Sequence, residues 1–390
     1  MRVFLRAALA FGAMALWLGA ATAQTIPFTF TDNRIFIPVS LNGHGPYSFI
    51  LDTGSSDWDV SGAIAQQLDL KQVSSQNIQG AGESKVQSNI FQVADTAVGA
   101  ARFRDQTFYS TDFSILERVI GFRHFDGIAG AQLFRAYAVA IDFDAGNVRL
   151  TDSAHYAPPP RAIRIPFTYA DESTPLVSGT IAGVQGKFIV DTGDRSSLTL
   201  FGPFWRAHHL DKALGPVRDA LTGYGVGGPI RGLVARVDKF NFGDAQVTDI
   251  VARLSLQKSG GFDDPNIAGS IGAGVLRHFH VTFDYAHKQI VLERGKNFDQ
   301  PDRFDRSGLW LGRDFAVYGV MDNSPASDSG LQVGDTVTAV DGVSVSKIDL
   351  FALRARLADP KTKDVLIAYQ RSSKTNVVRL KLRDLLPGHG

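Results

Sequence analysis

The 390-residue sequence contains no cysteine. Disulfide bonds, cysteine-ligated zinc, iron–sulfur clusters and a thiol nucleophile are therefore excluded. A large net charge of either sign is also lacking, because 40 Lys and Arg against 39 Asp and Glu give a formal net charge of only +1. Since the sequence has no run of basic residues either, it does not indicate nucleic acid or an anionic membrane as a partner.

The composition favours a large, mostly β protein. Hydrophobic residues make up 44% of the chain, and 39 glycines and 16 prolines separate short apolar runs rich in aromatic residues. Such a pattern is typical of strands joined by tight turns. The length predicts two or three domains, since single cores rarely grow beyond about 250–300 residues.

The N-terminus has the pattern of a secretory signal peptide. Arg2 and Arg6 precede an apolar stretch over residues 7–20, and three small residues ending at Ala23 follow. These features predict a signal peptide over residues 1–23, cleavage after Ala23, and export to the periplasm or the cell exterior. An uncleaved membrane anchor is the alternative, but the apolar stretch is shorter than the roughly 20 residues of a spanning helix.

An internal duplication follows the signal peptide. Four sequence blocks occur twice in the same order, first at residues 26–29, 49–54, 98–99 and 127–143 and then at residues 165–168, 188–193, 242–243 and 269–285. The second block reads FILDTG in the first copy and FIVDTG in the second. A duplicated domain explains this order better than chance does, so we predict two lobes, over residues 24–152 and 165–294. The segment between them, residues 153–164, contains three consecutive prolines and is predicted to be an extended linker.

Residues 303–387 have a different pattern and are predicted to form a small α+β module. A strand is expected over residues 315–321, and a second, over residues 337–340, ends in an Asp-Gly hairpin turn. An amphipathic helix is expected over residues 349–357, because its leucines fall on one face.

The two Asp-Thr-Gly sequences carry the chemistry. Asp52 and Asp191 each end an apolar strand at the same place in a repeat. A pseudo-twofold arrangement of the lobes would bring the two carboxyl groups together, and two carboxylates that close cannot both ionise. One would then act as a base toward water, while the other, protonated, polarises a carbonyl group. This chemistry points to hydrolysis of peptide bonds.

These features resemble the retropepsin-type and pepsin-type aspartic proteases, with both lobes in one chain. The resemblance covers residues 26–294 and implies two β-barrel lobes, each with a catalytic loop, a glycine-rich flap hairpin and an apolar-apolar-glycine element beneath the loop. Residues 128–130 and 270–272 match that last element. The residues expected to support the dyad are Thr53, Gly54, Ser55, Thr192, Gly193 and Asp194, and the flap candidates are Gly80, Gly82, Tyr224 and Gly225. Tyr224 either closes over substrate or is an exposed aromatic residue of a turn.

Asp194 departs from the family pattern, which has Ser, Thr or Ala at this position, as Ser55 does in the first lobe. A third carboxylate beside the dyad would raise the pKa values of the coupled pair. Two functions therefore stay open. One is an exported aspartic endopeptidase that acts as a monomer on proteins or peptides, and the other is a periplasmic peptide-binding or scaffold protein that has lost hydrolysis.

Residues 303–387 resemble a PDZ domain of the bacterial exported-protease type. The matching segments are residues 308–311, 323–326, 329–331, 333–335 and 340–342. Members of that family bind the C-termini of peptides by strand addition, which implies a role in substrate recruitment or regulation. The resemblance assigns carboxylate capture to the loop of Gly308, Leu309, Trp310 and Leu311. A domain that only packs against the protease lobes is the alternative.

No cofactor and no metal are expected. His278 and His280 alternate on a predicted strand, but the sequence places no acidic third ligand near them. Histidine pairs without further partners are usually surface or packing residues.

Overall fold

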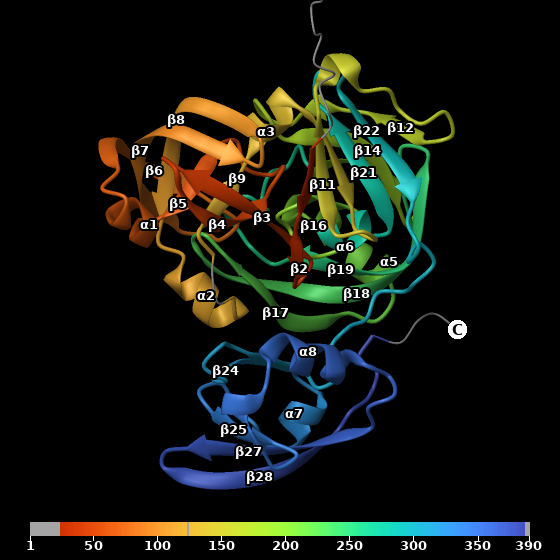
Figure 1. Ribbon diagram of the computed structural model, residues 1–390. Helices are drawn as coiled ribbons and strands as arrows, with labels where there is room; N and C mark the ends of the chain where they lie inside the picture. The colour runs from red at the N-terminus through yellow and green to blue at the C-terminus, as the bar shows by residue number, and fades with distance from the viewer. Residues whose placement is uncertain (1–23, 123–124, 387–390) are drawn as a thin grey trace, which may run out of the picture.

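The computed structural model describes residues 24–122 and 125–386 (Figure 1). The predicted signal peptide lies outside the described residues. Among the residues described, no helix is long and apolar enough to cross a membrane.

The first lobe is built on an eight-stranded sheet with the order β2-β3-β4-β9-β5-β8-β7-β6. An additional pairing of β3 with β7 closes part of this sheet into a barrel. The strands are β2 (Thr29–Thr31), β3 (Arg34–Leu41), β4 (His44–Leu51), β5 (Trp58–Ser61), β6 (Lys71–Gln79), β7 (Lys85–Val98), β8 (Ala101–Thr111) and β9 (Gly127–Ala129), and the helices are α1 (Gly62–Gln67), α2 (Ser114–Ile120) and α3 (Ala131–Ala136).

The second lobe repeats this topology strand for strand, with the order β13-β14-β15-β20-β16-β19-β18-β17 and an additional pairing of β14 with β18. Its strands are β13 (Thr168–Tyr169), β14 (Pro175–Ile181), β15 (Val184–Asp191), β16 (Leu198–Leu200), β17 (Arg218–Gly225), β18 (Gly228–Phe242), β19 (Ala245–Ser255) and β20 (Gly269–Gly272), and its helices are α4 (Gly202–Ala207), α5 (Leu210–Ala213) and α6 (Ala273–Leu276). The prediction of a mostly β fold with two duplicated β-barrel lobes is confirmed.

A third sheet joins the lobes. Its six strands are β1 (Gln24–Pro27), β11 (Asn147–Thr151), β10 (Ala138–Asp142), β21 (Phe279–Asp284), β22 (Gln289–Arg294) and β12 (Ile163–Pro166), in that order. The lobes meet where β10 pairs antiparallel with β21, so that Ile141 lies opposite Val281. Because strands of both lobes share this sheet, one continuous apolar core runs through them.

The segment between the lobes is shorter than predicted. Residues 153–155 form the 3₁₀ helix η1 (Ser153–His155), and β12 begins at Ile163, inside the predicted linker. The three prolines lie before this strand, so they do not prevent Ile163 and Arg164 from pairing with β22.

The C-terminal module lies against the lobes (blue in Figure 1) and combines two small sheets with two helices. Its elements are β23 (Leu309–Leu311), β24 (Val317–Val320), α7 (Pro325–Asp328), β25 (Thr336–Val340), β26 (Val343–Ser344), η2 (Val345–Lys347), α8 (Leu350–Ala358), β27 (Asp364–Arg371) and β28 (Lys374–Lys381). The strand predicted over residues 315–321 is shorter than expected, because Phe315 adopts a left-handed conformation with φ of 55°. The predicted helix is α8, and the Asp349 carboxylate caps it by accepting the Ala352 N–H at 2.8 Å.

Contacts between α8, β23 and the first lobe fix the position of this module. Phe351 stacks on Phe122 with ring centroids 5.8 Å apart. The Trp310 indole donates to the Val119 carbonyl at 3.0 Å, and Arg354 donates to the Ile120 carbonyl at 2.7 Å. The module therefore contacts the end of α2.

Candidate active site

Asp52 and Asp191 meet at the junction of the two lobes. Their strands β4 and β15 pair in parallel with β9 and β20, and the two carboxyl groups form a hydrogen bond with each other. The Gly54 N–H donates to Asp52 Oδ1, and the Gly193 N–H donates to Asp191 Oδ1, both at 2.8 Å. The same backbone N–H bond thus orients each aspartate in its own lobe.

Thr53 and Thr192 connect the two Asp-Thr-Gly loops through hydrogen bonds. Each hydroxyl accepts the backbone N–H of the opposite threonine at 3.0 Å. Each also donates to a carbonyl of the opposite strand at 2.7 Å, Thr53 to Val190 and Thr192 to Leu51. Both threonines are fully buried, so these four bonds fix the separation of the aspartates without competition from water.

The glycines of the two loops pack against the opposite carboxyl group. A Cβ atom at Gly54 would lie 2.6 Å from Asp191 Cγ, and one at Gly193 would lie 2.4 Å from Asp52 Cγ. Any side chain at either position would therefore push the two aspartates apart. Close approach of the dyad requires glycine at both positions.

The two aspartates differ in their affinity for a proton. Burial raises the pKa of Asp52, but the hydrogen bond from Asp191 stabilises its ionised form. Burial together with the charges of Asp52 and Asp194 raises the pKa of Asp191 well above its ordinary range. The pair therefore shares one proton over a range of pH, and the charge of Asp194 favours its retention on Asp191. One carboxyl group can act as a base and the other as an acid.

Asp194 is buried in an ion pair. Its carboxylate accepts from Arg253 Nη2 at 2.9 Å and from the Thr199 hydroxyl at 2.8 Å. Burial opposes ionisation, but the charge of Arg253 and the bonds from Ser196 and Thr199 hold the pKa of Asp194 below its usual value. Its backbone N–H still donates to Asp191 Oδ1 at 3.0 Å. The departure from Ser, Thr or Ala thus preserves the local turn and adds a charge that Arg253 balances.

Two glycine-rich hairpin tips, one from each lobe, contact each other. The first lies between β6 and β7, and the second lies between β17 and β18. The Gly82 N–H donates to the Val226 carbonyl at 2.8 Å, and the Ser84 N–H donates to the Gly227 carbonyl at 3.1 Å. A Cβ atom at Gly82 would lie 2.2 Å from the carbonyl carbon of Gly227, so the tips are in direct backbone contact. The flap candidates of both lobes lie in or beside this contact.

Two apolar clusters combine a strand residue near each aspartate with the flap of the other lobe. The first apolar cluster contains Phe36, Ile50, Phe113, Leu116, Ile120, Phe122 and Phe125, with Tyr224 and Val226 packed against it. The second apolar cluster contains Phe201, Ile230 and Phe262, with Ala81, Ile189 and Ile267 packed against it. Ile50 precedes Asp52 by two residues and Ile189 precedes Asp191 by two residues, so each isoleucine shares the strand face of its aspartate. Tyr224 packs against an apolar cluster and is not an exposed turn residue.

The loop of Gly308 to Leu311, to which the PDZ resemblance assigns carboxylate capture, makes hydrogen bonds within the chain. The Gly308 N–H donates to the Asp305 carboxylate, and the Leu309 N–H donates to the Ser307 hydroxyl at 3.1 Å. Arg354 Nη2 donates to the Leu311 carbonyl at 2.6 Å. Because Trp310 reaches the first lobe, the loop faces the protease lobes, and two of its amides donate within the chain.

His280 lies between two carboxylates, so the expectation that no acidic residue is near it is wrong. Its Nδ1 is 3.0 Å from Asp142 Oδ1, and its Nε2 is 3.1 Å from Asp144 Oδ2. These three groups are close enough for one ion, but they already pair with one another across the junction of the lobes. His278 is buried, and its Nδ1 is 3.0 Å from the Asn297 carbonyl oxygen.

A cluster of charges around Asp32 was not found from the sequence. Its carboxylate lies 2.8 Å from Arg34, 2.7 Å from Arg195 and 4.0 Å from Arg354. These arginines come from the first lobe, the second lobe and the C-terminal module, so Asp32 joins all three parts. In the sequence, Asp32 belongs to an ordinary hairpin turn between β2 and β3, and no local signal distinguishes it.

Comparisons with known proteins match two parts of the chain. Residues 37–130 match the family described as Aspartyl protease, and residues 317–371 match the family described as PDZ domain. Among solved structures, the chain is similar to the crystal structure of the aspartic proteinase from Irpex lacteus, with 15% identity and a TM-score of 0.47 over 72% of this chain and 99% of that chain. A search of curated proteins gave no match. The first lobe therefore carries an aspartyl protease match, and the C-terminal module carries a PDZ domain.

Proposed function

We propose that this protein is an exported aspartic endopeptidase that acts as a monomer on protein or peptide substrates. The observation that carries the proposal is the contact between Asp52 and Asp191, which share one proton in a junction held by Thr53 and Thr192. Export is proposed from the pattern of residues 1–23 alone. Monomeric action is proposed because one chain supplies both aspartates.

The different proton affinities of the two aspartates define the roles in hydrolysis. Ionised Asp52 takes a proton from a water molecule, whose oxygen attacks the scissile carbonyl carbon. Protonated Asp191 donates to the carbonyl oxygen, which becomes a hydroxyl of the tetrahedral intermediate. Return of a proton to the amide nitrogen then allows the C–N bond to break into a carboxylic acid and an amine.

The alternative, a binding protein that has lost hydrolysis, is less well supported. It was suggested by Asp194, whose charge is balanced by Arg253 and whose N–H donates to the dyad as the turn requires. The two apolar clusters beside the aspartates suit apolar side chains on both sides of a scissile bond, which favours a peptide as the ligand.

The test is turnover of a peptide library by the purified protein and by two variants, Asp52→Asn and Asp191→Asn. Each variant should lose at least about a thousandfold in kcat while its unfolding midpoint stays near that of the parent. If the parent binds peptides without cleaving them over a wide pH range, the alternative hypothesis of a peptide-binding protein is correct. Specific activity should be constant on dilution, and a steep fall would show that the site needs two chains.

A further inference from the structure

Asp59 is a buried carboxyl group of the first lobe to which the hydrolysis mechanism gives no role. It lies on β5 opposite Ile128 of β9, and Ile128 lies opposite Ile50 of β4. Residues directly opposite each other on neighbouring strands project their side chains from the same face of the sheet. Asp59 therefore shares the sheet face of Ile50, which is also the strand face of Asp52.

This face forms one wall of the candidate active site. Ile50 belongs to the first apolar cluster, and Ile128 packs against that cluster together with residues of the second-lobe flap. The charge of Asp52 acts on Asp59, so the two carboxyl groups lie near each other. A peptide whose scissile bond lies at Asp52 therefore brings a neighbouring side chain to the row of Ile50, Ile128 and Asp59.

The charges around Asp59 are all of its own sign. Among the described residues, neither a hydrogen bond nor a positive charge is found at its carboxyl group, and the groups that act on it are Asp52 and Asp57. Opposite it on β8 lies Tyr109, whose hydroxyl accepts from Gln76. Burial and the two like charges raise the pKa of Asp59 to about 7. Because an unpaired buried carboxylate is costly, a cationic group that reaches Asp59 would be bound favourably.

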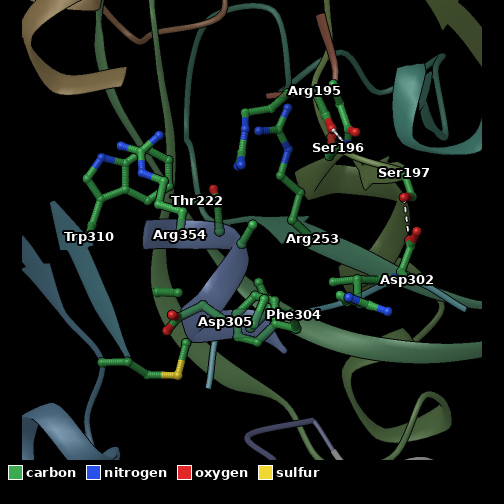
Figure 2. A pocket seen from close by; sticks show the side chains of 18 of the residues that line it. Arg195, Ser196, Ser197, Thr222, Arg253, Asp302, Phe304, Asp305, Trp310 and Arg354 are labelled. Atoms are coloured by element: carbon green, nitrogen blue, oxygen red, sulfur yellow. Dashed lines mark hydrogen bonds between the residues drawn. The ribbon is translucent and has the colours of Figure 1, made fainter. Parts of the chain in front are cut away.

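The second lobe pairs its buried acidic group within the chain. Thr199 on β16 is the counterpart of Asp59, because β16 and β5 hold the same place in the two sheets. Opposite Thr199 on β19 is Arg253, which lines the pocket between the second lobe and the PDZ domain shown in Figure 2. Arg253 pairs with Asp194 at 2.9 Å. The first lobe has Tyr109 at the corresponding place, so Asp59 depends on a cation from outside the chain.

We propose that Asp59 determines substrate specificity by binding a lysine or arginine side chain next to the scissile bond. This inference rests on the proposed function, since it assigns a substrate class to the same site. The aliphatic stem of the bound side chain packs on Ile50 and Ile128, while its charged end reaches the Asp59 carboxylate. A close charge pair of this kind supports a preference of at least about tenfold over a neutral side chain of similar length.

The preference should depend on pH, because Asp59 is mostly ionised at pH 8 and mostly protonated at pH 5. Lysine and arginine side chains stay charged over this range. The ratio of kcat/KM for a basic peptide to that for a neutral peptide should therefore be at least about tenfold at pH 8 and at most about twofold at pH 5. Titration of the dyad affects both peptides alike, so it cancels in this ratio.

The probes are amidated octapeptides of alanine, valine and phenylalanine in which one position at a time is lysine, arginine, norleucine or acetyl-lysine. Norleucine keeps the stem of lysine without its charge, and acetyl-lysine keeps its length. The ratio of kcat/KM is measured on the whole protein at both pH values. Binding is measured by calorimetry on Asp191→Asn, so that the preference can be read without turnover. We expect lysine, arginine or both to be favoured at pH 8, and the position would identify the subsite.

The variant Asp59→Asn tests the assignment and should reduce the ratio at pH 8 to about twofold or less, both in kcat/KM and in binding to Asp191→Asn. The control is Asp69→Asn, an exposed residue of the same lobe, which should keep the ratio of the parent. The pH dependence is measured on the parent, so it tests the proposal independently of how the variants fold.

The outcomes separate this inference from the proposed function. Binding with the basic preference but without cleavage would support Asp59 as a cation site and contradict the endopeptidase. Cleavage without a basic preference, a preference equal at pH 5 and pH 8, or a preference that persists in Asp59→Asn would each overturn the inference while leaving the endopeptidase in place. Neither binding nor cleavage of any probe would overturn both.

Discussion

Arg253 and Asp194 form a buried ion pair next to the Asp-Thr-Gly loop of the second lobe, with Nη2 and Oδ1 2.9 Å apart. The arginine is 6% exposed and the aspartate 7%. Burying both charges is costly unless each is paired and hydrogen-bonded, and here Thr199 and Ser196 complete the bonding. The pair thus links the loop that holds Asp191 to β19.

Replacing Asp194 tests this link. Asp194→Ser should move the alkaline limb of the pH–activity profile to lower pH, because the charge of Asp194 helps to raise the pKa of Asp191. It should also destabilise the fold by roughly 3–5 kcal/mol, because Arg253 is left buried without its partner. The double variant with Arg253→Met should recover most of that stability. A single variant with unchanged stability and profile would contradict the pairing.

The hydrogen bonds between Thr53 and the second lobe predict a large loss of stability when Thr53 is replaced by valine, which has a similar volume. Thr53→Val removes a hydroxyl that donates to Val190 and accepts from Thr192, and leaves both partners buried. The expected loss is roughly 2–5 kcal/mol of the free energy of unfolding, measured by urea denaturation. As a control, Thr375→Val on β28, where the threonine is exposed, should stay within about 0.5 kcal/mol. Equal effects of the two variants would show that the cross-lobe bonds are not stabilising.

Structural features that occur in both copies of the duplication could be predicted from the sequence. The two Asp-Thr-Gly loops, their strands and the lobes could be predicted, because identical local patterns at matched positions imply identical local structure. Contacts between non-equivalent residues could not be predicted, since nothing in the sequence relates Asp194 to Arg253 or Asp32 to Arg354. The six-stranded sheet was missed for the same reason, because each of its short strands reads as the edge of its own lobe.

The contact of the flap tips predicts that a small side chain there is harmful. In Gly82→Ala, the added methyl group would collide with the backbone of Gly227 and hold the tips apart. We expect kcat/KM for a short peptide to fall roughly tenfold or more, since closure over the substrate is impaired. The control is Gly62→Ala at the start of α1, where the nearest atom, the Ser110 hydroxyl, is 3.7 Å away. Unchanged kcat/KM in Gly82→Ala would show that the tips need not meet during turnover.

A PDZ domain that only recruits or regulates would leave the hydrolysis of short peptides unaffected. The structure gives a different expectation, because Phe351 of α8 packs on Phe122 and on the first apolar cluster with Tyr224. Phe351→Ala should raise KM for a short peptide severalfold through loosening of that cluster. Val377→Ala is the control, since this valine is 58% exposed on β28. If KM changes for neither variant, the PDZ domain does act apart from the cleft.

Asp59 predicts how stability changes with pH. It is 9% exposed beside the first catalytic loop, and burial together with the charges of Asp52 and Asp57 raises its pKa to about 7. The folded protein therefore binds this proton more tightly than the unfolded chain does, so the contribution of Asp59 to stability is fully present below about pH 4 and is lost as the pH rises through about 7. Asp59→Asn cannot ionise, so it should be more stable than the parent by roughly 2–4 kcal/mol at pH 8 and should differ little at pH 4. Urea denaturation at both pH values measures the difference, with the exposed Asp69→Asn as control. A constant difference between Asp59→Asn and the parent at both pH values would show that Asp59 is not the titrating group.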